Sequence, residues 1–312
     1  MKSDKNLMSE AAVLYYEKKF TQQEIAQIMN LSRQTVSKLL NDAQKEGIVE
    51  IKIHNPQADL SKLEKRIKEL FSIEDVKICS VSANDNKLRR IMTAKLACEY
   101  ILPYIKSGDK KIAVSWGQTV QAFIQEMPEI VTNGNTVFPL FGATERQQTY
   151  FLSNELARIF ADKINAKTNF AWFPYKPDSQ CDCDLFKKTT YYRNMEDNWN
   201  SIDIAIVGIG NKSAISLLGK SFGSDEEDDL AVGDIATHTF NINGELLPTY
   251  GNTLCVSSDS LRTAKKRLGI ACGDNKVEAI IGALRSGLLS TLITDDYTAQ
   301  KVLENIEADS SN

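Results

Sequence analysis

A polar turn directly after a short apolar run is the first feature of the sequence that could bind an anion. The segment IAVSWGQT ends in a turn that contains Ser115, Gly117, Gln118 and Thr119. A turn from a strand into a helix directs backbone N–H groups and the positive end of the helix dipole toward a bound anion. We therefore expect these residues to cradle a phosphate or a carboxylate; an ordinary strand-to-helix turn is the alternative.

Two charged residues elsewhere in the sequence are also candidates for contact with a ligand. Lys276 follows the run GIACGDN and opens a predicted helix, where a cation opposes the helix dipole. A bound anion would offset the unfavourable interaction between this cation and the helix dipole. The alternative is that Lys276 is a solvated surface lysine. Asp234 lies in the apolar stretch LAVGDIA, where its carboxylate either binds sugar hydroxyl groups or stabilises a turn.

Other chemistry has little support in the composition. The two histidines, His54 and His238, cannot build a His-rich metal site, and the C-x-C pair of Cys181 and Cys183 lacks zinc-site spacing. We expect no metal, reduced thiols, solvated loops at 181–184 and in the acidic run 224–229, and an ordinary strand position for His238. Gly-Ile-Gly after a predicted strand is not a full dinucleotide fingerprint, so we expect no cofactor.

The 312 residues suit one small module joined to one large domain. A hydrophobic content of 42% and a charged content of 25% are typical of soluble globular proteins. No apolar run is long enough to span a bilayer and the polar start MKSDKNLMSE is unlike a signal peptide, which predicts a cytoplasmic protein. The net charge of −4 is distributed unevenly, because the first 55 residues are close to neutral.

Three helices are predicted in the N-terminal region. The first covers 9–20 with Ser9 as its cap. Thr21 begins the second helix and forms a capping box with Glu24, and a third helix covers 32–45. Asn30 tolerates the left-handed backbone that the tight turn between the last two helices needs, and the alternating stretch 48–53 predicts a strand of a wing.

Two capped helices around a tight turn are typical of a helix-turn-helix, whose second helix enters the major groove of DNA. Arg33 and Gln34, near the start of that helix, have the donors that read guanine and adenine edges. A helical hairpin with merely solvated polar residues is the alternative. The predicted DNA contacts are Gln22, Gln23, Ser32, Arg33, Gln34, Thr35, Ser37 and Lys38.

The pattern changes to repeating strands and helices from about residue 73, which predicts an α/β domain with a mostly parallel sheet. The predicted strands are 75–81, 111–115, 136–141, 167–173, 203–208, 269–273 and 290–294, and the predicted helices include 87–104, 147–164 and 275–285. We expect a winged helix-turn-helix domain over 1–55, a linker or oligomerisation helix within 56–72, and an effector-binding domain over 73–312.

Several segments, in this order, resemble the SorC/DeoR-type family of sugar-responsive transcription regulators. The resemblance covers nearly the whole chain and is carried by TQQEIAQIMNLSRQTVSKLLNDAQKEGIVEI, IAVSWGQTV, IAIVGIGN, AVGDIATHTFNINGE and CGDNKVEAIIGALRSGLLSTLITDDYTA. It implies a winged helix-turn-helix followed by an effector domain similar to sugar-phosphate isomerases and glucosamine-phosphate deaminases.

The resemblance also implies roles for individual residues. The family's phosphate-binding turn matches Ser115–Thr119, its lysine matches Lys276, and its Gly-Asp-Ile motif matches Asp234. Some members form a Schiff base with a lysine where this chain has Phe141, so we expect no covalent imine. The altered turn leaves a small organic acid as an alternative to a sugar phosphate. The turn that begins at this position adds three expected effector contacts: Gly142, Ala143 and Thr144.

The sequence therefore predicts a regulator of a carbohydrate or organic-acid catabolic operon. Its partners would be double-stranded operator DNA, a small anionic effector and further copies of the chain, in a dimer or a tetramer. Two alternatives stay open: a sugar-phosphate isomerase or deaminase fused to a DNA-binding module, and a DNA binder that responds to no effector. No convincing acid–base pair accompanies the phosphate turn, so we expect no enzymatic activity.

Overall fold

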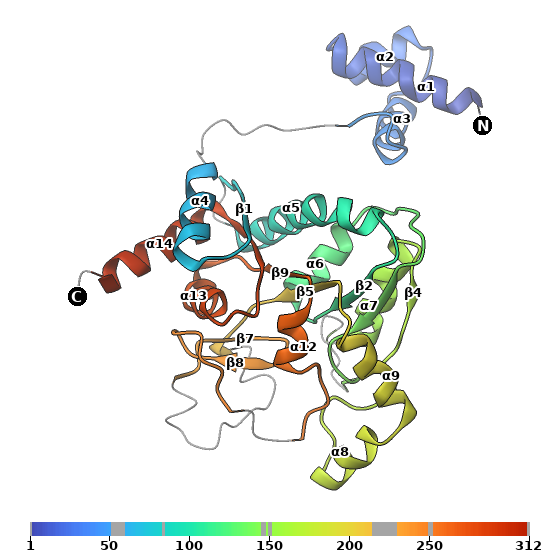
Figure 1. The fold of residues 1–312 in the computed structure, drawn as a ribbon. Coiled ribbons are helices and arrows are strands. Elements are labelled where there is room, and N and C mark those ends of the chain that lie inside the picture. The colour runs from blue at the N-terminus through green and yellow to red at the C-terminus, as the bar shows by residue number, and fades with distance from the viewer. Residues whose placement is uncertain are drawn as a thin grey trace. The chain divides into compact units, whose positions relative to one another are not determined.

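The computed structural model describes residues 2–50, 60–82, 85–144, 148, 152–213, 230–248 and 252–310. The chain forms two compact units, Met1–Gln57 and Ala58–Asn312, whose elements are labelled in Figure 1. None of the helices in the described ranges combines the length and the apolar character that crossing a membrane requires.

The first unit consists of helices. They are α1 (Lys2–Ala12), the π-helical turn η1 (Val13–Glu17), α2 (Gln22–Ile28) and α3 (Arg33–Lys45). The prediction that Ser9 caps the first helix is wrong, because α1 starts seven residues earlier, at Lys2, and Ser9 lies inside it. The polar start of α1 is held in part by an ion pair of 3.0 Å between Lys5 and Glu46.

The predicted caps of the helix-turn-helix are confirmed. The Thr21 hydroxyl accepts a hydrogen bond from the Glu24 N–H, and the Glu24 carboxylate accepts one from the Thr21 N–H. The Ser32 hydroxyl accepts the N–H of Thr35, and Asn30 has the left-handed φ of 56° that the turn requires. The helices of this unit share a small buried core: Ala11, Ala12, Ile25, Val36, Leu40 and Ala43.

The predicted wing strand falls largely outside the described residues, which exclude 51–59. Ile48 and Val49 are described, and both are half-buried against the helical core without forming a strand. They extend the core of the first unit beyond the end of α3.

The second unit is built on a seven-stranded sheet whose strand pairs are all parallel, as predicted. The strand order is β1-β10-β9-β5-β2-β3-β4. The bounds are β1 (Asp75–Cys79), β2 (Lys111–Val114), β3 (Thr136–Pro139), β4 (Lys167–Thr168), β5 (Ile204–Gly208), β9 (Lys266–Ile270) and β10 (Thr291–Asp295).

Helices cover both faces of this sheet. Figure 1 shows α5 and α6 on one side and α12 and α13 on the other, as right-handed crossovers between parallel strands require. The bounds are α4 (Leu60–Phe71), α5 (Asn86–Lys106), α6 (Gln118–Glu126), α7 (Ser153–Lys163), α8 (Gln180–Lys187), α9 (Thr190–Trp199), α12 (Ser258–Thr263), the 3₁₀ turn η3 (Asp274–Lys276), α13 (Val277–Arg285) and α14 (Asp296–Ser310).

Three predictions for this unit are corrected. The strand expected at 269–273 is β9, which begins three residues earlier, at Lys266. Residues 181–184 belong to helix α8, where Cys183 is buried, and are not a solvated loop. The strand expected at 167–173 contains only the two residues of β4. The acidic run 224–229 lies outside the described residues.

A second, small antiparallel sheet was not predicted. It is formed by β6 (Gly210–Asn211), β7 (Gly233–Ile235) and β8 (His238–Phe240). His238 lies in β8 as expected for a strand residue, with its Nε2 3.0 Å from the Val256 carbonyl oxygen. Because β6 follows β5 after a single residue, this sheet is attached at the carboxyl end of the large one.

The chain order creates a switch point in the large sheet. From β2 the chain continues to β3 and β4 on one side, and it later returns to β5 and β9 on the other side. The two connections leave the sheet in opposite directions, so a crevice opens at the carboxyl ends of β2 and β5. Open parallel sheets usually hold ligands at such a point.

Candidate functional site

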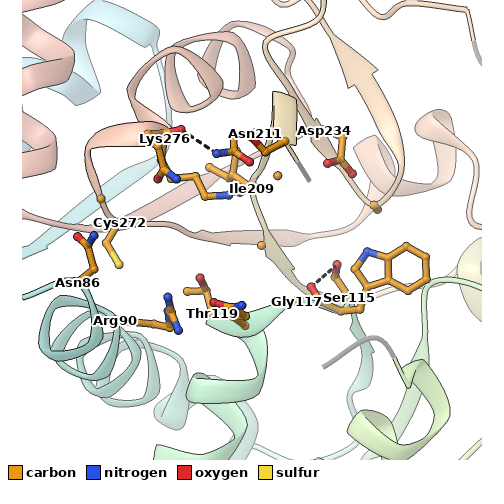
Figure 2. A pocket seen from close by; sticks show the side chains of 18 residues that line it. Asn86, Arg90, Ser115, Gly117, Thr119, Ile209, Asn211, Asp234, Cys272 and Lys276 are labelled. Carbon is orange, nitrogen blue, oxygen red and sulfur yellow. Dashed lines mark hydrogen bonds between the residues drawn. The ribbon is translucent and has the colours of Figure 1, made fainter. Parts of the chain in front are cut away.

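A cavity of about 310 Å³ lies at this crevice. Figure 2 shows side chains from both sheets and from α5 pointing into it. Six of the predicted effector residues line it: Ser115, Gly117, Gln118, Thr119, Asp234 and Lys276. The structure thus brings the three separate sequence segments together at one place.

Two glycine turns shape the floor of the cavity. Gly117 precedes α6 with φ 112° and ψ 162°, and Gly273 precedes η3 with φ 107° and ψ 154°. This backbone region is essentially restricted to glycine. A Cβ added at Gly117 would have no atom within 4 Å, so the requirement comes from the backbone and not from lack of space. The first turn places the N-terminus of α6, with Gln118 and Thr119, at the cavity, where the first N–H groups of a helix have no partner within the helix.

Ser115 and Trp116 form the wall next to the first turn. The Ser115 hydroxyl donates to the Trp116 carbonyl oxygen at 3.3 Å, a bond that Figure 2 marks. The Trp116 ring stacks on Phe141 with 4.1 Å between the ring centroids and contacts Tyr175 edge-on at 5.1 Å. The indole is therefore held rigidly, with 7% of its surface exposed.

Lys276 faces the cavity from the end of η3, directly before α13. Its ammonium group donates to the Ile209 carbonyl oxygen at 2.7 Å. Burial lowers the pKa of Lys276 below its ordinary value, while the nearby Asp234 carboxylate acts in the opposite direction. An anion in the cavity would stabilise the charged form of this lysine.

Asp234 lies in β7 with 5% of its surface exposed. Its Oδ2 accepts the N–H of Thr237 at 3.2 Å across the turn that joins β7 to β8. The two residues of this turn, Ala236 and Thr237, have φ values of 48° and 70°, which are uncommon for residues other than glycine. Asp234 therefore stabilises a turn and also lines the cavity, so the two readings of its role are compatible.

Several lining residues were missed from the sequence. Asn86 and Arg90 come from α5, four residues apart and so on one face of that helix. Asn211 ends β6, Cys272 follows β9, and Asn275 lies in η3; the Asn211 side chain donates to the Asn275 carbonyl oxygen at 3.1 Å. The i,i+4 spacing of the α5 pair was the available signal. It could not be interpreted without knowing which strands α5 covers.

Cys272 contributes a thiol to the lining, but not a reactive one. Burial raises its pKa to about 11, so the thiol is protonated near neutral pH. The thiolate is the reactive form of cysteine. Among the described residues, no three histidine, cysteine or acidic side chains are grouped as metal ligands would be.

Three predicted effector residues lie elsewhere in the described structure: Gly142, Ala143 and Thr144 do not line the cavity. The Gly142 N–H donates to the Leu254 carbonyl oxygen at 3.0 Å, and the Ala143 N–H donates to the Phe173 carbonyl oxygen at 2.8 Å. A Cβ at Gly142 would lie 2.4 Å from the Pro174 backbone. These hydrogen bonds join the turn to neighbouring backbone segments. The turn contacts a residue that lines the cavity through Phe141, whose ring stacks on Trp116. Its neighbours Arg146 and Gln147 lie outside the described residues.

The candidate DNA-binding face lies at the start of α3. Arg33, Gln34 and Lys38 are exposed there, and the first acid along α3 is Asp42. The other predicted contacts differ in accessibility: Ser32, Thr35 and Gln23 are exposed, whereas Gln22 and Ser37 are half-buried. The Thr35 hydroxyl lies 2.8 Å from the Ser32 hydroxyl within the cap.

Comparison with known proteins identifies both units. Residues 55–304 match the family model described as "Putative sugar-binding domain", and residues 8–66 match a Crp-like helix-turn-helix domain. The sorbitol operon regulator of Klebsiella pneumoniae is 27% identical over 311 residues, which cover 96% of this chain and 98% of the relative. The deoxyribonucleoside regulator of Bacillus subtilis is 28% identical over 307 residues, which cover 96% and 98%.

Solved structures agree with this assignment. The full-length sorbitol operon regulator SorC of Klebsiella pneumoniae superimposes with a TM-score of 0.78 at 26% identity, covering 96% of this chain and 98% of that one. These relatives are transcriptional regulators and not enzymes. The chain therefore belongs to the SorC/DeoR-type family of transcriptional regulators, with a helix-turn-helix for DNA and a sugar-binding domain for its effector.

Proposed function

We propose that the effector is a phosphorylated sugar and that it binds in the cavity at the carboxyl ends of β2, β5 and β9. Its phosphate would lie between the turn at Gly117–Thr119 and Lys276, and its hydroxyl groups would reach Asp234. The observation that carries this proposal is the part-buried ammonium group of Lys276, whose pKa is lowered by burial and which lines the same cavity as the N-terminus of α6 after Gly117. An anion is the ligand that this arrangement stabilises.

The DNA contacts are proposed at the start of α3. Arg33 and Gln34 would read base edges in the major groove of an operator, and Ser32, Thr35, Ser37 and Lys38 would contact phosphates or a thymine methyl group. Gln22 and Gln23, at the start of α2, would contact the backbone. The exposure of Arg33 and Lys38 on a stretch without acids supports this assignment.

The domain limits are proposed as 1–55, 56–72 and 73–312, with a homo-oligomer as the active form. Helix α4 of the second unit supports a role for 56–72 in assembly or linkage. Its Ile67 is buried against the domain, whereas Leu70 keeps 52% of its surface exposed. An apolar side chain left in this position is available for a second subunit.

Two measurements test the proposal in sequence. Thermal-shift screening with sugar phosphates and small organic acids should find a compound that raises the melting temperature, because a ligand of the folded state stabilises it. The same compound should then change the affinity for a promoter fragment, measured by fluorescence anisotropy. A protein stabilised by no sugar phosphate but by an organic acid would contradict the phosphorylated effector.

A further inference from the structure

The turn that leads to Lys276 is tied to helix α14 by buried hydrogen bonds. The Gly273 N–H donates to the Thr298 hydroxyl at 2.8 Å, and this hydroxyl donates in turn to the Asp295 carboxylate. Thr298 and Asp295 are both fully buried. A movement of the Gly273 turn therefore displaces or breaks bonds that lie at the start of α14.

Arg89 makes a second connection between the same two elements. Its guanidinium group lies 3.0 Å from the Asp274 carboxylate of η3 and packs 4.3 Å from the centre of the Tyr297 ring of α14. Arg89 has 3% of its surface exposed, and closely packed groups of this kind transmit a displacement to their neighbours. The start of α14 is thus held to η3 at two places.

Helix α14 also packs on α4, the first helix of the second unit along the chain (Figure 1). Ile67 of α4 and Val302 of α14 belong to the same buried core. Arg66 of α4 forms an ion pair with Glu307, which lies about 14 Å further along α14 than Thr298. α14 therefore joins the cavity turn at its start and α4 along its length.

The other neighbour of α4 offers a less direct connection. α4 packs mainly on β1 and α14. None of the described residues that line the cavity belongs to β1, and every residue of this strand pairs in register with β10. A change at the cavity would reach α4 through β1 only by moving the sheet itself. α14 is the more direct route, because it is bonded to the cavity turn and lies outside the sheet.

We propose that Thr298 is a positioning residue that couples the cavity turn to α14, and that α14 passes occupancy of the cavity on to α4. This inference rests on the proposed function, because it requires an effector that contacts Lys276. A ligand that holds Lys276 fixes η3, and the buried bonds behind η3 transmit this local change to α14. Since α4 follows the DNA-binding unit in the chain, the route leads from the effector to the segment that connects with that unit.

Hydrogen–deuterium exchange on the full-length protein tests the route, with inorganic phosphate as the probe. At a phosphate concentration about ten times its Kd, amides whose opening excludes the ligand should exchange up to about tenfold more slowly. Wild type should show this slowing in η3, in the first turns of α14 and in α4. Helix α8, which has no part in the route, should show none.

Substitutions of Thr298 test its role. Thr298→Val removes the hydroxyl group and keeps the shape of the side chain. The slowing should remain in η3 and fall to about threefold or less in α4. Thr298→Ser keeps the hydroxyl group and should retain the slowing in both places.

The matched control is Thr132→Val. Thr132 is also buried, and its hydroxyl donates to the Ile164 carbonyl oxygen at 2.6 Å, outside the cavity lining. This variant should lose stability and keep the slowing in α4. The readout thus separates coupling from a merely structural loss.

A substitution at the far end of the route decides the matter if Thr298→Val does not fold. Arg66→Glu replaces the ion pair between α4 and α14 with a repulsion, at a side chain that is 57% exposed, so the fold should tolerate it. The slowing should persist in α14 and decrease in α4, and Arg66→Glu/Glu307→Arg should restore it. An undiminished slowing in α4 of Arg66→Glu would overturn the route through α14.

The outcomes separate this inference from the proposed function. Slowing in η3 of wild type without slowing in α4 would overturn the route and leave the binding site intact. Slowing in α4 that persists in Thr298→Val would overturn the role of Thr298. No change in η3 or at the start of α6 of wild type would overturn the proposed function and the inference together.

Discussion

Arg33 carries the sharpest prediction for DNA recognition at the scale of single residues. Its side chain is exposed at the first position of α3, where a recognition helix meets base edges. Arg33→Ala should lower operator affinity by about 1–3 kcal/mol if the guanidinium reads a guanine. Fluorescence anisotropy with a labelled promoter fragment measures the change.

The control for this prediction is Lys106→Ala, which removes an exposed cation from the second unit. It should leave operator affinity unchanged at the same salt concentration. If Arg33→Ala binds the operator as tightly as wild type does, Arg33 is not a base contact.

Lys276 makes the affinity for an anionic effector depend on pH. Its pKa in the free protein is lowered by burial, and a bound anion would raise it, so binding takes up a proton at alkaline pH. Affinity should therefore be full below the lowered pKa and fall as pH rises toward the ordinary lysine value of about 10.4. The Cys272 thiol, with a pKa of about 11, titrates above this range.

A conservative variant isolates the lysine. In Lys276→Arg the guanidinium group stays charged across this range, because the pKa of arginine exceeds about 12. Calorimetric titrations of inorganic phosphate at several pH values should show a flatter profile for Lys276→Arg than for wild type. Parallel profiles in the two proteins would assign the pH dependence to another group.

The sequence located residues that precede helices but not those that face the cavity from a distant helix. Ser115, Gly117 and Lys276 were predicted because each stands just after an apolar strand, a pattern visible within a few residues. Arg90 was missed because its position depends on α5 packing against β1, β10 and β9. That arrangement follows from the strand order, which local patterns do not contain.

At the scale of elements, the turn before α6 depends on one glycine. Gly117 has φ 112° and ψ 162°, a conformation that costs other residues about 1–3 kcal/mol. Gly117→Ala should therefore displace the start of α6, weaken phosphate binding and lower the melting temperature. Calorimetry and thermal unfolding measure the two effects.

Gly287 supplies a matched control for the backbone effect. It has φ 71° and no atom within 4 Å of an added Cβ, and it lies outside the cavity lining. Gly287→Ala should lower stability by about 1–2 kcal/mol without changing phosphate affinity. Equal losses of phosphate affinity in both variants would show that the effect at Gly117 is not local.

The elements themselves were predicted to different extents. The strands of the large sheet were found because buried parallel strands are apolar runs, as in β5 and β10. The start of β9 was predicted three residues too late because its first two residues, Lys266 and Arg267, are charged and do not continue the apolar run. Their long side chains reach polar or aromatic partners. The small sheet was missed because strands of two or three residues carry no periodic signal.

At the scale of the whole molecule, the proposed oligomer makes a geometric prediction for DNA. A symmetric dimer would place two recognition helices on palindromic half-sites separated by whole turns of DNA. Inserting about five base pairs, half a turn of B-DNA, between the half-sites should weaken binding strongly, and inserting about ten should restore much of it. Gel-shift titrations of the three promoter fragments measure this, and equal affinity for all three would contradict the symmetric arrangement.

We expect occupancy of the cavity to change the affinity of the helix-turn-helix for DNA. An effector does this only if it binds the two DNA-binding states with different affinity. The most direct measurement is operator affinity with and without a saturating sugar phosphate that thermal shift shows to bind, in wild type and in Lys276→Met. The operator affinity of wild type should change when the sugar phosphate is added, and that of Lys276→Met should not. The same operator affinity in wild type at every concentration of a bound effector would contradict it.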